Sequence, residues 1–232
     1  DAHDFSIPLL KVSLALAAAS FNSSQVPYAE SGPKAAQIRC KYLKTAYEKL
    51  GFSDSDMKFY NYEIPMNDTN DKVAYGIAKK EILINGEVYT LIAVQPRSGN
   101  YSGEWVSNFH IDPYKIGDTQ YSIGFGKPAE EIYNSLKEEL SLIPEGSDGK
   151  KKVKILISGF SRGGAVSNAL AGEVTKHADE LGLDTKNIYA YTFATPNAVI
   201  LNQAENITSD YTNIHNTINP CDIVPSVPPS TM

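Results

Sequence analysis

The chain has 232 residues, which is enough for one α/β domain with a sizeable hydrophobic core. Hydrophobic residues make up 42% of the sequence, charged residues 21%, and the net charge is -6 at pH 7. This acidic balance argues against binding to nucleic-acid phosphates and gives no electrostatic attraction to anionic lipid. Contact with a lipid surface would therefore be hydrophobic, and no apolar run is long enough to predict a transmembrane helix.

The N-terminal quarter predicts two helices. The first covers residues 8–20 and is rich in Leu and Ala. Asp1 and Asp4 precede it and Lys11 interrupts it, which favours a core helix over a signal peptide. The second covers 33–50, beginning at Pro33 and stopping at Gly51.

Strands are predicted at 58–63, 73–80 and 88–95, and the last two flank Asn85-Gly86, a strong hairpin signal. Residues 96–127 have the composition of a loop. A helix over 128–140 begins at Pro128. A strand at 153–157, a helix over 162–180 and strands at 188–194 and 212–218 follow.

Strand–helix–strand alternation with short connections predicts an α/β fold with a mainly parallel central sheet and helices on both faces. We expect a single domain over 1–232, with N-terminal helices in 1–55 and the core in 56–232. Cys40 and Cys221 are too few for a zinc site. One disulfide and two buried free thiols are both compatible with them.

The strongest local signal is Gly159-Phe160-Ser161-Arg162-Gly163, a G-x-S-x-G motif between a predicted strand and a predicted helix. The turn is so sharp that a Cβ at either glycine would clash, and it holds the serine hydroxyl above the sheet edge. The alternative is a tightly packed turn without chemistry. A phosphate-binding loop would need glycine patterns that the chain lacks.

Further segments resemble the class 3 (fungal-type) lipases, which have the α/β-hydrolase fold. The resemblance covers roughly residues 73–229. Residues Leu91 to Gly99 are similar to that family's strand ending in R-G-S/T, and Tyr191 to Pro196 are similar to its strand ending in F-G-x-P. Residues Asn219 to Pro225 are similar to its N-x-x-D-x-V-P segment. Residues 104–108 and 124–125 are also similar to a bacterial lipase-like subgroup. Phe160 departs from the family's histidine at that position.

The resemblance implies roles for individual residues. Ser161 would be the nucleophile and Asp222 the acidic member of a triad, although an aspartate beside prolines is also common in turns. Arg162 would give one oxyanion-hole N–H. The second would come from Gly99, which register with the family favours, or from Ser98; both otherwise form a surface turn.

A serine nucleophile needs a base, and this fold places its histidine after the acidic residue. No histidine follows Asp222. We therefore expect the catalytic core to be truncated at the C-terminus, with the histidine beyond Met232, and this chain to be weakly active or inactive. His110 is the only substitute, because it lies in the loop near the serine.

Three other histidines have different expectations. His3 should be a mobile surface residue, His177 should lie near the C-terminus of a helix, and His215 should pack in the sheet.

Residues 100–121 are candidates for a lid. Trp105 and Phe109 are four residues apart, so one helical turn would put both on one face. They would form either the apolar underside of a lid or a plug in the core.

The sequence therefore predicts a carboxylic ester hydrolase acting through a serine acyl-enzyme on an acylglycerol or another lipophilic ester, without metal or organic cofactor. The alternatives are a non-catalytic binding or scaffold protein with this fold, or a serine acyltransferase or amidase. The resemblance also implies secretion.

Overall fold

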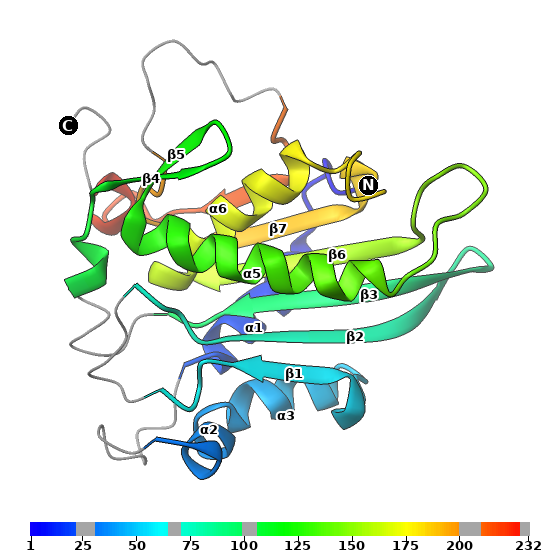
Figure 1. Cartoon of the computed structure of the whole chain (residues 1–232), viewed down its shortest axis with the longest axis horizontal. Helices are drawn as coiled ribbons and strands as arrows, with labels where there is room; N and C mark the ends of the chain where they lie inside the picture. The colour runs from blue at the N-terminus through cyan, green and yellow to red at the C-terminus, as the bar shows by residue number, and fades with distance from the viewer. Residues whose placement is uncertain (22–30, 65–70, 99–105, 200–209, 228–232) are drawn as a thin grey trace.

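A computed structural model describes residues 1–21, 31–64, 71–98, 106–199 and 210–227. A central sheet has the strand order β1-β2-β3-β6-β7-β8 (Figure 1). Its strands are β1 (Met57–Tyr60), β2 (Tyr75–Ile84), β3 (Glu87–Pro96), β6 (Val153–Phe160), β7 (Ile188–Phe193) and β8 (Ile214–Thr217). The sheet is antiparallel from β1 to β3 and parallel from β3 to β8.

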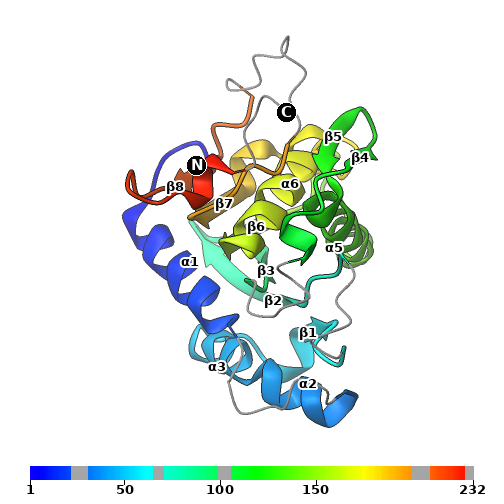
Figure 2. The same cartoon turned by 90° about the vertical axis from the view of Figure 1, so that its left-hand side faces the viewer.

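Helices cover both faces of the sheet (Figure 2). One face carries α5 (Ile123–Ser141) and α6 (Arg162–Lys176). The other carries α1 (Ile7–Ala19) and α3 (Lys41–Lys49), with α2 (Pro33–Arg39) before α3. Each face has its own cluster of buried hydrophobic residues. The predicted α/β architecture is confirmed.

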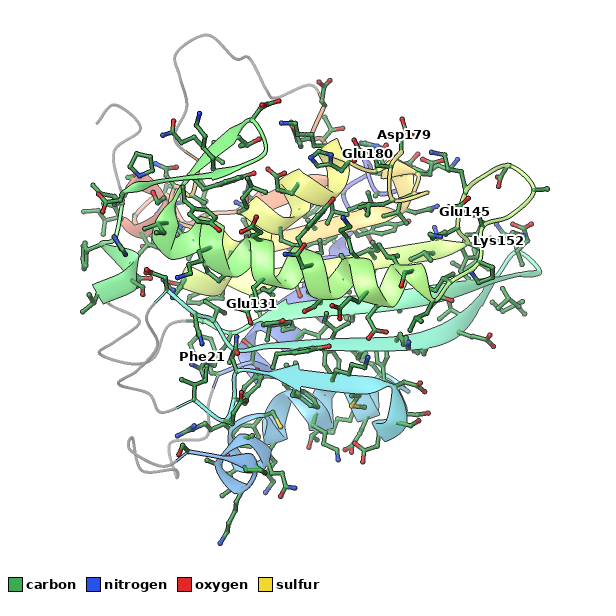
Figure 3. The ribbon with its side chains drawn as sticks, in the orientation of Figure 1. Phe21, Glu131, Glu145, Lys152, Asp179 and Glu180 are labelled. Carbon is green, nitrogen blue, oxygen red and sulfur yellow. The ribbon has the colours of Figure 1, made fainter. Side chains whose placement is uncertain are left out.

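The helix α1 is a core helix, as predicted. The side chain of Ser6 caps its start by accepting from the backbone N–H of Leu9 at 3.5 Å. Leu16 and Ala17 are buried against the sheet. Phe21 follows and packs on Phe160, with ring centroids 5.8 Å apart (Figure 3). The N-terminal segment therefore supports the end of β6.

The predicted helix over 33–50 is two helices, because the chain turns at Cys40. Gly51 ends the second with φ of +81°, as expected of a glycine stop. Both cysteines are free: Cys40 is buried, whereas Cys221 is exposed. The structure therefore has neither a disulfide nor two buried thiols.

The prediction of a loop over 96–127 is wrong in its second half. Residues 113–122 form the hairpin of β4 (Pro113–Ile116) and β5 (Thr119–Ser122), and α5 begins at Ile123 with Pro128 in its interior. Glycines are poor helix formers, yet tertiary packing requires Gly124: a Cβ there would lie 1.9 Å from the Ser107 carbonyl oxygen.

The β4–β5 hairpin is fixed to α6. The hydroxyl of Tyr121 donates to the buried carboxylate of Glu173 at 2.6 Å. Burial is the main cause that raises the pKa of Tyr121 well above its usual range, and the Glu173 carboxylate raises it further. The phenol therefore stays protonated and keeps donating.

The described elements also include 3-10 helices at Asp54–Asp56, Thr185–Asn187 and Val224–Ser226. The helix α6 ends at Lys176, four residues before the predicted end. His177 is its C-cap, with a φ of -102° and a ψ of 20° that leave the helical region.

Glu139 joins the antiparallel strands β1 and β2 to α5 through ion pairs. We expect these ion pairs to make the free energy of unfolding fall at acid pH. Its buried carboxylate contacts the ammonium groups of Lys58 and Lys79, the latter at 2.7 Å. Burial alone would raise the pKa of Glu139, but the two lysines outweigh it and lower the pKa below its usual value.

A lowered folded-state pKa stabilises the fold above the unfolded-state pKa, and this stabilisation is lost as the pH falls through the folded value. Glu139→Gln should cost about 2 kcal/mol of unfolding free energy at pH 7 and flatten the decline below about pH 4.5. Urea unfolding across this range measures both. Glu87→Gln, which breaks an exposed ion pair with Lys152, is the control and should change little. Equal slopes for wild type and Glu139→Gln would contradict the prediction.

Candidate active site

The candidate residues gather at one edge of the sheet. Because β3, β6, β7 and β8 are parallel, the segments that follow them emerge at the same edge. Ser98 follows β3, Ser161 follows β6 and Asp222 lies after β8. The start of α6 and the turn 224–226 are both at this edge in Figure 1. The labelled residues Glu145, Lys152, Asp179 and Glu180 lie toward the opposite edge (Figure 3).

Ser161 lies on the predicted strand-to-helix turn. It is half-buried and has φ of 52° and ψ of -123°, a conformation that L-residues rarely adopt. Such a conformation costs about 1–3 kcal/mol, so its surroundings must enforce it. The backbone N–H of Ser161 donates to the Phe193 carbonyl at 2.9 Å, which ties the turn to the end of β7.

The glycines of the motif permit this turn. A Cβ on Gly159 would lie 2.2 Å from the carbonyl oxygen of Gly163 and 2.5 Å from Ser167 Oγ. A Cβ on Gly163 would lie 2.8 Å from the Pro96 carbonyl oxygen. These contacts confirm that the sharp turn requires glycine on each side of Ser161. They also place the turn after β3 directly against the start of α6.

A buried polar pair outside the predicted motifs joins β3 to β6 just before the strand-to-helix turn at residues 159–163, which we call the elbow. Gln95 Nε2 donates to the Ser158 carbonyl and Ser158 Oγ donates to Gln95 Oε1, both at 2.5 Å. The two bonds continue the link between the strands beyond the last paired residues, Val94 and Ile157. A glutamine directly after the apolar run Leu91 to Val94 was the available signal.

The turn after β3 is partly described. Ser98 is buried, and its hydroxyl has no hydrogen-bond partner among the described residues. Arg97 donates its backbone N–H to Ala74 at 2.8 Å, and its guanidinium lies over the ring of Tyr62. Gly99, the preferred second oxyanion donor, lies outside the described residues.

Asp222 is half-buried in the turn after β8. Its Oδ1 accepts from the backbone N–H of Val224 at 3.0 Å, and its own N–H donates to the Asn219 carbonyl at 2.9 Å. This is the turn geometry expected of an aspartate beside prolines. The turn's hydrogen bonds use Oδ1 and not Oδ2, and they hold the carboxyl in a defined place.

The family description "Lipase (class 3)" matches residues 93–232, which is more than half of the chain. The chain belongs to the class 3 lipase family. This membership supports a lipase or ester hydrolase activity. The matched region contains the elbow, the hairpin and the turn with Asp222.

Solved lipase structures share the fold of this class 3 lipase-family protein. A fungal lipase–inhibitor complex aligns with a TM-score of 0.60 and 19% identity, covering 98% of this chain and 77% of that one. A triacylglycerol lipase described as having a serine protease triad gives 0.58 and 19%, covering 97% and 75%. The Rhizomucor miehei triacylglyceride lipase gives 0.56 and 19%, covering 96% and 74%. No curated protein sequence matches the chain.

His110 is not hydrogen-bonded to Ser161 in the structure. Its Nδ1 lies 2.9 Å from Asp71 Oδ2 and its Nε2 lies 3.2 Å from Asp112 Oδ2. Both ring nitrogens therefore face carboxylates, which does not favour His110 as a base for the serine.

The other histidines are engaged elsewhere. His177 caps α6, as expected, and lies 3.5 Å from Glu173. His215 packs in the sheet against Tyr191, with ring centroids 4.8 Å apart, also as expected. His3 differs from the expectation of a mobile residue, because its ring nitrogens contact the hydroxyls of Thr212 and Thr185 at 2.7 and 3.3 Å.

The described part of the candidate lid is residues 106–121, of which 113–121 belong to the β4–β5 hairpin. Residues 106–108 are helical, and the side chains of Val106 and Phe109 are 73% and 74% exposed. Phe109 therefore does not plug the core. Trp105 lies outside the described residues.

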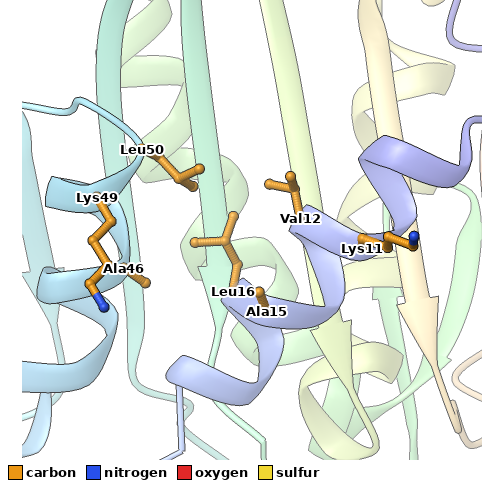
Figure 4. A pocket seen from close by; sticks show the side chains of 7 residues that line it. All are labelled: Lys11, Val12, Ala15, Leu16, Ala46, Lys49 and Leu50. Atoms are coloured by element: carbon orange, nitrogen blue, oxygen red, sulfur yellow. The ribbon is translucent and has the colours of Figure 1, made fainter.

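An apolar groove between α1 and α3 lies away from the candidate active-site residues (Figure 4). It is lined by Lys11, Val12, Ala15, Leu16, Ala46, Lys49 and Leu50. None of these belongs to the elbow, and α1 covers the opposite face of the sheet from α6. Among the described residues, no group of three His, Cys, Asp or Glu could hold a metal ion, and no described helix has the length and apolarity to cross a bilayer.

Proposed function

We propose that the protein is a carboxylic ester hydrolase in which Ser161 attacks the ester carbonyl and forms an acyl-enzyme that water then hydrolyses. The observation that carries this proposal is the strained conformation of Ser161 at the start of α6. A fold keeps such strain where a function requires it. The helix N-terminus adds a positive potential beside the hydroxyl.

The oxyanion formed during attack needs donors aimed at it. We assign one to the backbone N–H of Arg162, which lies at the start of α6. The second is assigned to the turn after β3, at Gly99 or Ser98. The close contact of this turn with Gly163 supports the assignment, and the buried hydroxyl of Ser98 is a further donor there.

Asp222 is proposed as the acidic member of the triad, orienting a histidine and stabilising its protonated form. Its place after β8, at the edge where Ser161 emerges, supports this role.

The proposed substrate is an acylglycerol or another lipophilic ester. We propose that the protein binds it at a lipid–water interface through the apolar side chains of residues 105–109. The proposed location of the protein is outside the cytoplasm. Family membership supports both. The exposure of Val106 and Phe109 beside the elbow supports the interfacial contact.

A fluorophosphonate probe tests the nucleophile directly. We expect one covalent adduct, located on Ser161 by mass spectrometry, in the protein expressed from its complete reading frame (the full-length protein), and no adduct in its Ser161→Ala variant. Absence of labelling in the full-length protein would favour a non-catalytic scaffold. Labelling with turnover of amides or acyl transfer, but not of esters, would favour the amidase or acyltransferase alternative.

A further inference from the structure

Arg162 has a buried side chain, although an arginine on the first turn of a helix is usually exposed. Only 1% of its surface is accessible. Its Nη1 donates to Asn108 Oδ1 at 2.9 Å, and its guanidinium carbon lies 5.7 Å from the centre of the Phe125 ring. A guanidinium stays charged in a protein, so its burial is costly unless such contacts offset it.

Asn108 stands on a segment that other contacts fix. The hydroxyl of Ser107 accepts from the backbone N–H of Asp71 at 3.0 Å, and the carboxylate of Asp71 contacts His110. The carbonyl oxygen of Ser107 packs against Gly124 so closely that a Cβ there would clash. Contacts with Asp71 and Gly124 therefore hold residues 107–110 in place independently of Arg162.

Phe125 gives Arg162 a second fixed contact. Its ring is fully buried near the start of α5, in the core cluster that also holds α6. A guanidinium between an amide oxygen and an aromatic face has a defined position and plane. The Arg162 side chain thus joins the start of α6 to residues 107–110 and to α5.

We propose that Arg162 is a positioning residue: its clamped guanidinium holds the peptide between Ser161 and Arg162 in the orientation that points its N–H at the oxyanion. The proposal rests on the proposed function. The peptide adjoins the strained Ser161, which would relax if its surroundings allowed it. Oxyanion donors contribute only when held close to the productive geometry, so a small shift of this peptide should slow acylation.

Asn108 is the residue to change, because its loss weakens the clamp and leaves every proposed reacting group in place. In the full-length protein, Asn108→Ala should lower kcat for a soluble ester, and the rate of fluorophosphonate labelling, by about tenfold, with KM unchanged within about twofold. Asn108→Asp keeps an acceptor oxygen and should restore most of the loss.

The matched control is Asn187→Ala. The side chain of Asn187 also accepts from a cation, Lys154 Nζ at 2.7 Å, but before β7, at the opposite edge of the sheet. This variant should keep the wild-type kcat. A purely structural role for Asn108 would instead give a lowered melting temperature with kcat unchanged.

A double-mutant cycle with Arg162→Lys completes the test, since lysine keeps the charge but cannot reproduce the planar contacts. We expect the double variant to be no slower than the slower single variant, because both break one clamp. Additive losses, or a wild-type kcat in Asn108→Ala, would overturn the inference while labelling of Ser161 persists. If the wild type itself is neither labelled nor active, the proposed function fails, and this inference with it.

Discussion

Ester hydrolysis should fall by about 10⁴-fold or more in the full-length Ser161→Gly variant, while the stability of the protein rises. The loss of activity follows from removal of the attacking hydroxyl. The gain in stability follows from the φ of 52° at this position, which glycine adopts without strain. We expect about 1 kcal/mol, after subtracting the greater freedom of glycine in the unfolded chain.

Ser161→Ala separates the two effects. It removes the same hydroxyl but keeps a Cβ in the strained conformation, so it should be equally inactive and about as stable as the wild type. Initial rates on a soluble ester and urea unfolding of all three proteins make the comparison. Hydrolysis by Ser161→Ala within tenfold of the wild-type rate would remove Ser161 from the mechanism.

The second large effect is expected at Gly159. Alanine there would put a methyl carbon 2.2 Å from the carbonyl oxygen of Gly163 and 2.5 Å from its carbonyl carbon, which are both backbone atoms of the elbow. No side-chain rotation can relieve such a contact. Gly159→Ala should therefore cost about 3 kcal/mol or more of unfolding free energy and abolish hydrolysis, because the turn must open to admit the methyl group.

Gly172→Ala in α6, the helix that follows the turn, is the matched control. A Cβ there meets only the Tyr121 hydroxyl, at an ordinary 3.7 Å, and alanine is the better helix former. It should leave activity unchanged and stabilise the protein by up to about 1 kcal/mol. Urea unfolding with a common m-value measures both variants. Equal stability of Gly159→Ala and wild type would contradict the sharp-turn geometry.

Motifs with local causes were predicted accurately. The Asn85-Gly86 pair adopts positive φ at both residues and closes the β2–β3 hairpin, as the dipeptide predicts. The elbow also follows from local sterics, since two glycines around a serine between a strand and a helix permit little else. The acidic turn at Asp222 could be placed by resemblance, but its partner histidine could not.

The sequence by itself determined the alternation of strands and helices and the sharp turn at Ser161, because backbone sterics and hydrophobic periodicity act over a few residues. Only the tertiary structure decided that α5 begins at Ile123 and that Arg162 is buried against Asn108 and Phe125. These features depend on contacts between segments tens of residues apart. Packing against a segment distant in the sequence can outweigh the weak helix propensity of Gly124. Contacts with such segments can also offset the cost of burying the guanidinium of Arg162, which the sequence alone would place at the surface.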